Sequence, residues 1–125
     1  CRRNPQMKIF GLRYSNIMEE KDYKKFQSFQ KDPFLRKWNF WGYIDARDVA
    51  QACLLAMESK INGADHFIIA ADDTVMEEDN KSLLEKVFPN INIKGDIGKN
   101  KTLLSNEKAK NILGFKPEYS WKNYI

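Results

Sequence analysis

The sequence has few of the residues that cross-link, kink or ligate in small proteins: its 125 residues include two cysteines, four prolines, six glycines and one histidine. The cysteines, Cys1 and Cys53, cannot build a disulfide framework, and their spacing matches no metal site. No apolar run approaches the roughly eighteen residues of a membrane-spanning helix, and the first residues lack the apolar core of a signal peptide. We therefore expect a soluble, cytoplasmic chain with no metal and no membrane contact.

The composition is typical of one compact globular unit. Hydrophobic residues make up 42% of the chain and charged residues 30%. A chain of this length can bury roughly two-thirds of its unfolded surface, which suffices for a core without disulfides or metal. Twenty-one basic and 17 acidic residues leave a net charge of +4. This mild excess favours anionic ligands in general and specifies none.

Two apolar segments predict buried, parallel strands. Residues 7–14, MKIFGLRY, are almost continuously apolar, and residues 65–70, DHFIIA, follow the turn residues Asn62 and Gly63. Between these segments, Asp45 can cap a helix. The apolar stripe expected for this helix comprises Val49, Ala50, Cys53, Leu54 and Met57. The order of helix, tight turn and strand predicts an α/β fold with a few mostly parallel strands.

Weaker signals predict the elements toward the end of the chain. Asp79 or Asn80 can cap a helix that stops at the following proline. Residues 91–94 are expected to form a short edge strand. Ser105 is the expected cap of a last helix, which ends at Gly114 because glycine readily adopts the left-handed backbone of a helix C-terminus.

The stretch between the first strand and the capped helix is polar and aromatic. Residues 19–37 predict a short helix and a loop, because Pro33 interrupts the helical spacing. Residues 31–41, KDPFLRKWNFW, alternate basic and aromatic side chains, a pattern that can stack bases and neutralise phosphates. Large apolar side chains more often enter a core or line a ligand cleft, so we expect no nucleic-acid partner.

Three other patterns are better explained by structure than by chemistry. Residues 95–99, GDIGK, are too short for a phosphate loop and predict a turn. The carboxylates between residues 72 and 79 lack the ligand order of a calcium loop and predict a solvated surface. His66 has no accompanying serine or cysteine motif, so a core or rim position is expected rather than a catalytic triad.

Arg13 lies within the apolar segment 7–14. An unpaired charge buried there would cost several kcal/mol, so a carboxylate partner is expected. Asp48 or Asp45, at the start of the following helix, can provide it. This ion pair would be structural and would tie the strand to the helix.

Four blocks of sequence occur in a characteristic order: GLRYSNI at 11–17, NFWGYIDARDVAQACLLAM at 39–57, FIIAADDT at 67–74 and TLLSNEKAKNILGFKPEYSW at 102–121. This series resembles the C-terminal part of an NAD-dependent epimerase/dehydratase, one of the extended short-chain dehydrogenase/reductases. The resemblance covers nearly the whole chain and depends on the order and spacing of the blocks. It implies a single fragment over residues 1–125, with the last Rossmann strands and the small substrate-binding lobe.

The resemblance also implies which parts of the enzyme lie outside this chain. The family has its glycine-rich dinucleotide loop and its Tyr-x-x-x-Lys catalytic pair before the strand that matches residues 7–14, and neither pattern occurs here in that context. We therefore expect NAD or NADP to bind the full-length protein but not this fragment, which would contain no catalytic residue. The absent tyrosine would act as acid and base in hydride transfer, with its pKa lowered by the absent lysine.

The matching positions imply a set of residues that face the substrate or cofactor. Ser15 and Asn16 are expected as polar contacts and Tyr14 as a wall, at the carboxyl end of a strand where open parallel sheets bind ligands. Trp41 stands where sugar-nucleotide epimerases commonly have an arginine. It cannot neutralise a diphosphate, but it can stack on a sugar or base face. Tyr43 is also expected to face the substrate or cofactor.

The expected substrate is a small molecule, with a nucleotide sugar as the first candidate. Epimerase, dehydratase and reductase activities all remain open. The alternative is a stand-alone binding or protein-interaction module without catalysis, because an exposed sheet edge and aromatic loops can associate with a partner. A homo-oligomer is compatible with both hypotheses.

Overall fold

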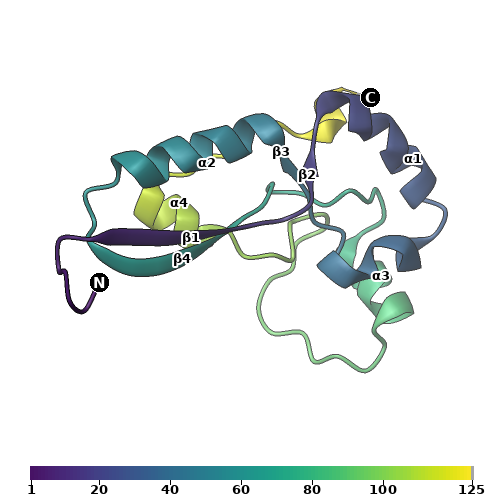
Figure 1. The fold of residues 1–125 in the computed structure, drawn as a ribbon. Coiled ribbons are helices and arrows are strands. Elements are labelled where there is room, and N and C mark those ends of the chain that lie inside the picture. Colours follow the sequence, from purple (N-terminus) through teal and green to yellow (C-terminus); the bar gives the residue numbers. More distant parts are fainter. Residues whose placement is uncertain (125) are drawn as a thin grey trace.

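The computed structural model describes residues 1–124 and shows a small α/β unit of parallel strands and helices (Figure 1). The α/β class predicted from the sequence is confirmed. Elements labelled η are short 3-10 helices. In chain order the elements are β1 (Lys8–Tyr14), β2 (Ile17–Met18), η1 (Glu20–Lys25), α1 (Phe26–Phe29), η2 (Pro33–Asn39), β3 (Ile44–Asp45), α2 (Ala46–Glu58), β4 (Gly63–Ile69), α3 (Asn80–Val87), α4 (Glu107–Leu113) and η3 (Trp121–Asn123).

Two parallel strand pairs form the framework. β1 and β4 pair along their full length, with Gly11 opposite His66. A short second pair, β2 and β3, brings Ile17 opposite Ile44. Parallel strands need a crossover connection, and α2 forms the last part of the connection that leads to β4. The prediction of mostly parallel strands is confirmed for the part of the chain that the structure describes.

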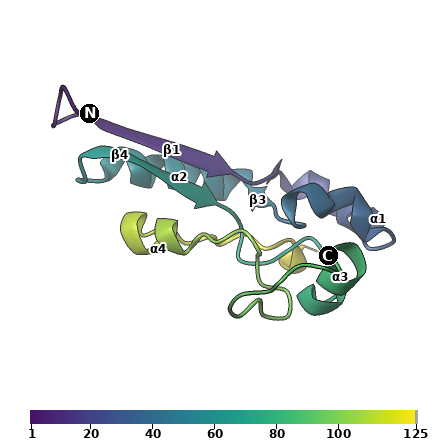
Figure 2. The ribbon, with the colours of Figure 1, turned by 90° about the horizontal axis from the view of Figure 1, so that it is seen from below.

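Helices cover one face of the β1–β4 sheet. α2 packs against β1, α4 packs against β4, and the two helices touch each other (Figures 1 and 2). Side chains alternate along a strand, so Phe10 and Phe67 pack inside while Ile9 is 52% exposed. β1 is therefore half-buried, and the prediction of a fully buried strand at residues 7–14 is wrong. His66 lies exposed on β4, not in the core.

Helix α2 begins at the predicted cap. The Asp45 carboxylate accepts a hydrogen bond of 2.8 Å from the backbone N–H of Arg47. This N–H lies in the first turn of the helix and has no partner within the helix itself. The buried stripe includes the small residues Ala52 and Ala56, which allow close packing. Leu54 and Met57, which the sequence analysis placed in the stripe, are 53% and 74% exposed. That part of the prediction is wrong, as it is for the exposed Ala50, because the packed face of α2 consists of Ala52 and Ala56 with Val49 and Leu55.

A lobe containing η1, α1, η2 and α3 lies beyond the carboxyl ends of β1 and β4 (Figure 1). The helix predicted within residues 19–37 is found as η1 and α1, but the predicted loop is only residues 30–32, because Pro33 starts the 3-10 helix η2. Phe26 lies among aromatic rings, with its centroid 5.4 Å from that of Tyr43 and 5.5 Å from that of Trp121, both close to edge-on. Such pairs add about 0.5–1.5 kcal/mol each beyond their buried area.

The ends of α3 and α4 follow the predictions in part. Asp79 caps α3, and Gly114 ends α4 with a left-handed φ of 72°. The residue that precedes α4 is Asn106, not the predicted Ser105, because the Asn106 amide is buried and donates to a carbonyl beyond β4. Residues 91–94 form an exposed irregular segment, and the predicted edge strand is wrong. The N–H of Ile91 donates to the carbonyl of Phe88 at 3.2 Å, which is a turn contact and not a strand pairing.

Candidate ligand site at the carboxyl end of β1

The turn that follows β1 is held between the two strand pairs. Ser15 donates its N–H to the carbonyl of Ile69 at 3.0 Å, and the carbonyl of Asn16 accepts from the N–H of Ile44 at 3.0 Å. Both residues are partly buried. The backbone bonds therefore fix the side chains of Ser15 and Asn16 at the carboxyl edge of the parallel strands, the position expected from the sequence.

A buried arginine faces this turn. Arg36, from η2, is only 9% exposed. Its terminal nitrogens Nη1 and Nη2 donate to the side-chain oxygen of Asn16 at 2.8 and 2.7 Å, with the amide oriented so that its oxygen faces the guanidinium. Hydrogen bonds from a charged donor are about twice as strong as neutral ones. Arg36 thus holds the Asn16 side chain in one orientation.

The guanidinium of Arg36 lies close to two aromatic rings. Its carbon is 5.1 Å from the ring centroid of Phe29 and 5.1 Å from that of Trp38. These contacts recover part of the cost of removing the cation from water. Burial lowers the pKa of Arg36, and no carboxylate among residues 1–124 opposes that shift. Arg36 is therefore a desolvated cation stabilised by an amide dipole and two rings.

The backbone after η2 turns sharply beside Ser15. Phe40 and Trp41 adopt left-handed φ values of 50° and 58°, which cost non-glycine residues about 1–3 kcal/mol each. At Gly42, an added Cβ would lie 2.6 Å from Leu104 Cδ1, 3.0 Å from Ser15 Oγ and 3.2 Å from the carbonyl oxygen of Asn39, so a side chain fits here only if these neighbours move. The turn therefore packs tightly against the residues that follow β1.

Three buried polar atoms in this region have no hydrogen-bond partner. They are Ser15 Oγ, Arg36 Nε and Asn39 Oδ1. The other amide atom of Asn39 is satisfied, because Nδ2 donates to the carbonyl of Gly42 at 2.8 Å. An unsatisfied buried polar atom costs about 1–3 kcal/mol, and most such groups in proteins are paired. The carboxyl edge of β1 thus combines a desolvated cation with unused hydrogen-bonding capacity.

Trp41 does not face a ligand in this structure. Its side chain is 0% exposed, and Nε1 donates to the carbonyl of Pro33 at 2.7 Å. The ring packs nearly edge-on against Phe88, with centroids 6.2 Å apart. The expectation that Trp41 stacks on a sugar or base is therefore wrong, because the tight turn directs the ring into the core of the lobe.

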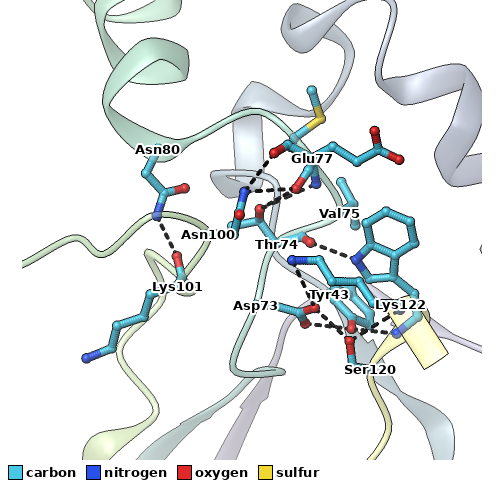
Figure 3. Close-up of polar contacts among 12 residues, drawn as sticks. Tyr43, Asp73, Thr74, Val75, Glu77, Asn80, Asn100, Lys101, Ser120 and Lys122 are labelled. Carbon is cyan, nitrogen blue, oxygen red and sulfur yellow. Dashed lines mark hydrogen bonds and ion pairs between the residues drawn. The ribbon is translucent and has the colours of Figure 1, made fainter.

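Tyr43 is also buried, and its hydroxyl joins a structural network (Figure 3). The hydroxyl donates to Asp73 Oδ1 at 2.7 Å and accepts from the backbone N–H of Trp121 at 3.1 Å. Asp73 Oδ2 accepts from the hydroxyl of Ser120 at 2.8 Å. Burial and then the Asp73 carboxylate raise the pKa of Tyr43. Tyr43 fastens the C-terminal segment to the lobe, and the expected substrate-facing position is not found.

Tyr14 keeps partial exposure, at 38%, on the edge of β1. Its hydroxyl lies 3.1 Å from the Cys53 thiol of α2. Burial, followed by this neighbouring thiol, raises the pKa of Tyr14 to about 12. The phenol therefore stays protonated at neutral pH, which is compatible with the wall position expected for it.

The predicted ion pair of Arg13 is not formed within residues 1–124. Arg13 is exposed, because it lies on the uncovered face of β1. Asp48 is buried and accepts instead from the backbone N–H groups of Glu118 and Tyr119, at 3.0 and 3.2 Å. Burial raises the pKa of Asp48. The alternative partner, Asp45, forms its ion pair with Arg47 at 2.8 Å, so both expectations for Arg13 are wrong.

Sequence reasoning missed Arg36 and Asn39. Both lie in the basic-aromatic run at residues 31–41, which was expected to enter a core or line a cleft. The available signal was an arginine flanked closely by aromatic residues, a composition that suits a stacked guanidinium. Sequence spacing alone does not show which of the basic residues in such a run is buried.

Two surface hollows of the described residues lie away from this turn. One of about 440 Å³ is lined by Glu20, Lys21, Tyr23, Lys24 and Tyr124. Another, of about 230 Å³, lies between residues 71–73 and residues 117–120. Neither contains a buried unpaired polar atom, so the chemistry favours the β1 turn over the larger hollow. Among residues 1–124 no group of three or more histidine, cysteine or carboxylate side chains could hold a metal ion.

The fold and the site together define a small α/β unit with polar groups gathered at the carboxyl edge of its parallel strands. Comparison with protein-family models, curated proteins and solved structures finds no match for this chain. No helix within residues 1–124 is long and apolar enough to cross a membrane.

Proposed function

We propose that this chain is the substrate-binding C-terminal part of an NAD-dependent epimerase/dehydratase of the extended short-chain dehydrogenase/reductase class. Its substrate would be a nucleotide sugar, changed by hydride transfer in the complete enzyme. The main support is the turn at Ser15 and Asn16. It follows a parallel strand at the edge where open α/β sheets bind ligands, and buried Arg36 holds the Asn16 amide in place.

In this proposal the chain binds and orients the substrate. Asn16 and Ser15 supply polar contacts, and Tyr14 forms a wall. Trp41 and Tyr43 act indirectly, because they pack and fasten the lobe that carries η2. The reaction class, whether epimerisation, dehydration or reduction, would depend on residues outside this chain.

The residues present do not fit a dinucleotide. A pyrophosphate needs free N–H groups at a helix N-terminus after a glycine turn. The longest helix, α2, instead begins with the buried carboxylates Asp45 and Asp48, which would repel a phosphate. We therefore assign cofactor binding to the part of the enzyme outside residues 1–125, and no step of the chemistry is assigned to this chain.

Two measurements test the proposal. In an isotope-labelled sample of the chain, UDP-glucose is expected to shift the backbone amide resonances of Ser15 and Asn16 and the side-chain amide resonance of Asn16. The Asn16→Ala variant should lose the response, whereas Asn111→Ala, at an exposed position of α4, should keep it. Titration calorimetry with NAD should show no micromolar binding. Micromolar NAD affinity in a well-behaved monomer would refute the proposal.

The alternative is a stand-alone binding or protein-interaction module. It is favoured by the uncovered face of β1, where Ile9 is 52% exposed, and by the exposed Leu54 and Met57 on α2. The coding sequence immediately before Cys1 distinguishes the enzyme proposal from the binding-module alternative. The enzyme proposal expects a glycine-rich strand–turn–helix segment and a Tyr-x-x-x-Lys pair there, and a reading frame without them would favour the module.

A further inference from the structure

We propose that Arg36 is the anchor for an oxyanion, a carboxylate or a phosphate, on the ligand that occupies the turn after β1. This inference rests on the proposed function for the identity of the ligand as a substrate. The binding of the anionic group itself can be measured independently of any cofactor or reaction. An anion anchor at Arg36 limits the substrate class to compounds that have a negative charge near the group that Asn16 contacts.

The first argument is the electrostatic balance of Arg36. Arg36 is 9% exposed as a residue and its Nε is buried, and buried cations are normally paired with an anion. Among residues 1–124 the Arg36 guanidinium has only the neutral side-chain oxygen of Asn16 as a hydrogen-bond partner. Burial lowers its pKa, and no carboxylate offsets this. The site therefore lacks one negative charge, which a ligand can supply.

The second argument is the unused hydrogen-bonding capacity. Arg36 Nε has no acceptor, and Ser15 Oγ nearby in the turn has no partner. A carboxylate or phosphate accepts from a guanidinium through two parallel bonds and from a hydroxyl through a third. An oxyanion would accept hydrogen bonds from both unsatisfied donors, Arg36 Nε and Ser15 Oγ, and would balance the charge of Arg36.

The third argument is access. Trp38 stacks over the guanidinium at 5.1 Å, yet the Trp38 side chain is itself 67% exposed. Rotation of a largely solvated side chain takes place rapidly and displaces little packing. The second ring near Arg36, that of Phe29, is partly buried and packs against the core. An anion can therefore reach Arg36 from the Trp38 side without unfolding the lobe.

The test follows the side-chain Nε–Hε resonance of Arg36 in the 125-residue chain. Sodium phosphate and, separately, sodium acetate are added, with sodium chloride at equal ionic strength as the control. Arg36→Lys identifies the resonance by its loss. We expect phosphate or acetate to shift the Arg36 signal saturably and chloride to leave it unchanged. A saturable response to one anion only identifies the charged group as phosphate or carboxylate.

Two variants separate a specific site from general attraction to a basic chain. With the Ser15 backbone amide resonance as the readout, which every variant retains, Arg36→Gln should weaken phosphate binding about tenfold or more, because a charged hydrogen-bonding partner is lost. Arg13→Gln removes the same charge from an exposed position and should leave the affinity unchanged. Equal losses in both variants, or no response of the wild-type signal, would overturn the inference.

A third variant remains informative if Arg36→Gln does not fold. Asn16→Asp places an internal carboxylate at the oxygen that Arg36 already contacts. It should raise the unfolding temperature and abolish the phosphate response. Raised stability with an undiminished phosphate response would contradict the proposed site. Because none of these experiments uses NAD or a nucleotide sugar, the anion site can fail while the proposed function stands, and the reverse.

Discussion

Substitution of Tyr43 by phenylalanine tests the contact that fastens the C-terminal segment to the lobe. The hydroxyl is fully buried, donates to Asp73 Oδ1 at 2.7 Å and accepts from the Trp121 N–H at 3.1 Å (Figure 3). The ring is 5.4 Å from Phe26, centroid to centroid, and the substitution leaves this packing unchanged. Tyr43→Phe therefore removes two hydrogen bonds and almost no apolar contact.

The expected loss of stability follows from the two partners. A hydrogen bond to a charged group contributes about 1.5–3 kcal/mol, and a buried N–H left without an acceptor costs about 1–3 kcal/mol. Asp73 keeps the hydroxyl of Ser120 at 2.8 Å and is partly exposed, so the two costs are not fully additive. We expect Tyr43→Phe to lower the free energy of unfolding by about 2–4 kcal/mol.

Urea unfolding followed by tryptophan fluorescence measures this difference, because Trp121 lies within the perturbed network. The matched control is Tyr14→Phe, which removes a hydroxyl that contacts only the Cys53 thiol at a partly exposed position. The control should cost less than about 1 kcal/mol. If Tyr43→Phe costs no more than the control at an unchanged urea slope, the network does not fasten the lobe and our reasoning is wrong.

Two further predictions concern other parts of the fold. Although burial opposes ionisation of Asp45, hydrogen bonds from Arg47 and Tyr23 hold its pKa below the ordinary value of 3.8. The ionised Asp45 carboxylate therefore stabilises the fold above pH 3.8, and this stabilisation is lost as the pH falls through the lower folded pKa. Asp45→Asn keeps a capping side chain but should lower the free energy of unfolding at neutral pH. In acid titrations monitored by circular dichroism, this variant should lose less stability below about pH 4 than the wild type does. Gly42→Ala should lower the free energy of unfolding by about 1–3 kcal/mol, because its Cβ would displace Leu104 and press against the carbonyl oxygen of Asn39, 3.2 Å away. Gly11→Ala, where the nearest atom is 3.6 Å away, should be neutral or stabilising in the same urea experiment, and similar losses in both variants would refute the steric argument.

The elements with long, regular patterns were predictable from the sequence. β1 and β4 were recognised from apolar runs, and α2 from the capping residue Asp45, because local side-chain chemistry determines a helix N-terminus. The predicted α2 stripe was wrong at Leu54 and Met57. The 3.6-residue period allows more than one apolar face when alanines and large residues share a helix, and tertiary packing selects the face.

The edge strand expected at residues 91–94 failed for a related reason. Alternating isoleucines favour a strand only where a neighbouring strand offers backbone partners. In the described chain this segment is exposed and irregular, with Ile91 and Ile93 at 45% and 39% exposure. Strand propensity is therefore insufficient evidence for an edge strand without a pairing partner.

The two arginines next to the candidate site show why a charge is hard to locate from sequence. Arg13 stands in an apolar strand, yet it is exposed, because successive residues of a strand point to opposite faces and only one face of β1 is covered. Arg36 stands in a charged, aromatic run, yet it is buried, because the strained turn at Phe40 and Trp41 folds η2 back against Asn16. The backbone of the turn, rather than the local composition, determines which cation loses its water, and a cation desolvated without a carboxylate is the one available to an anionic ligand.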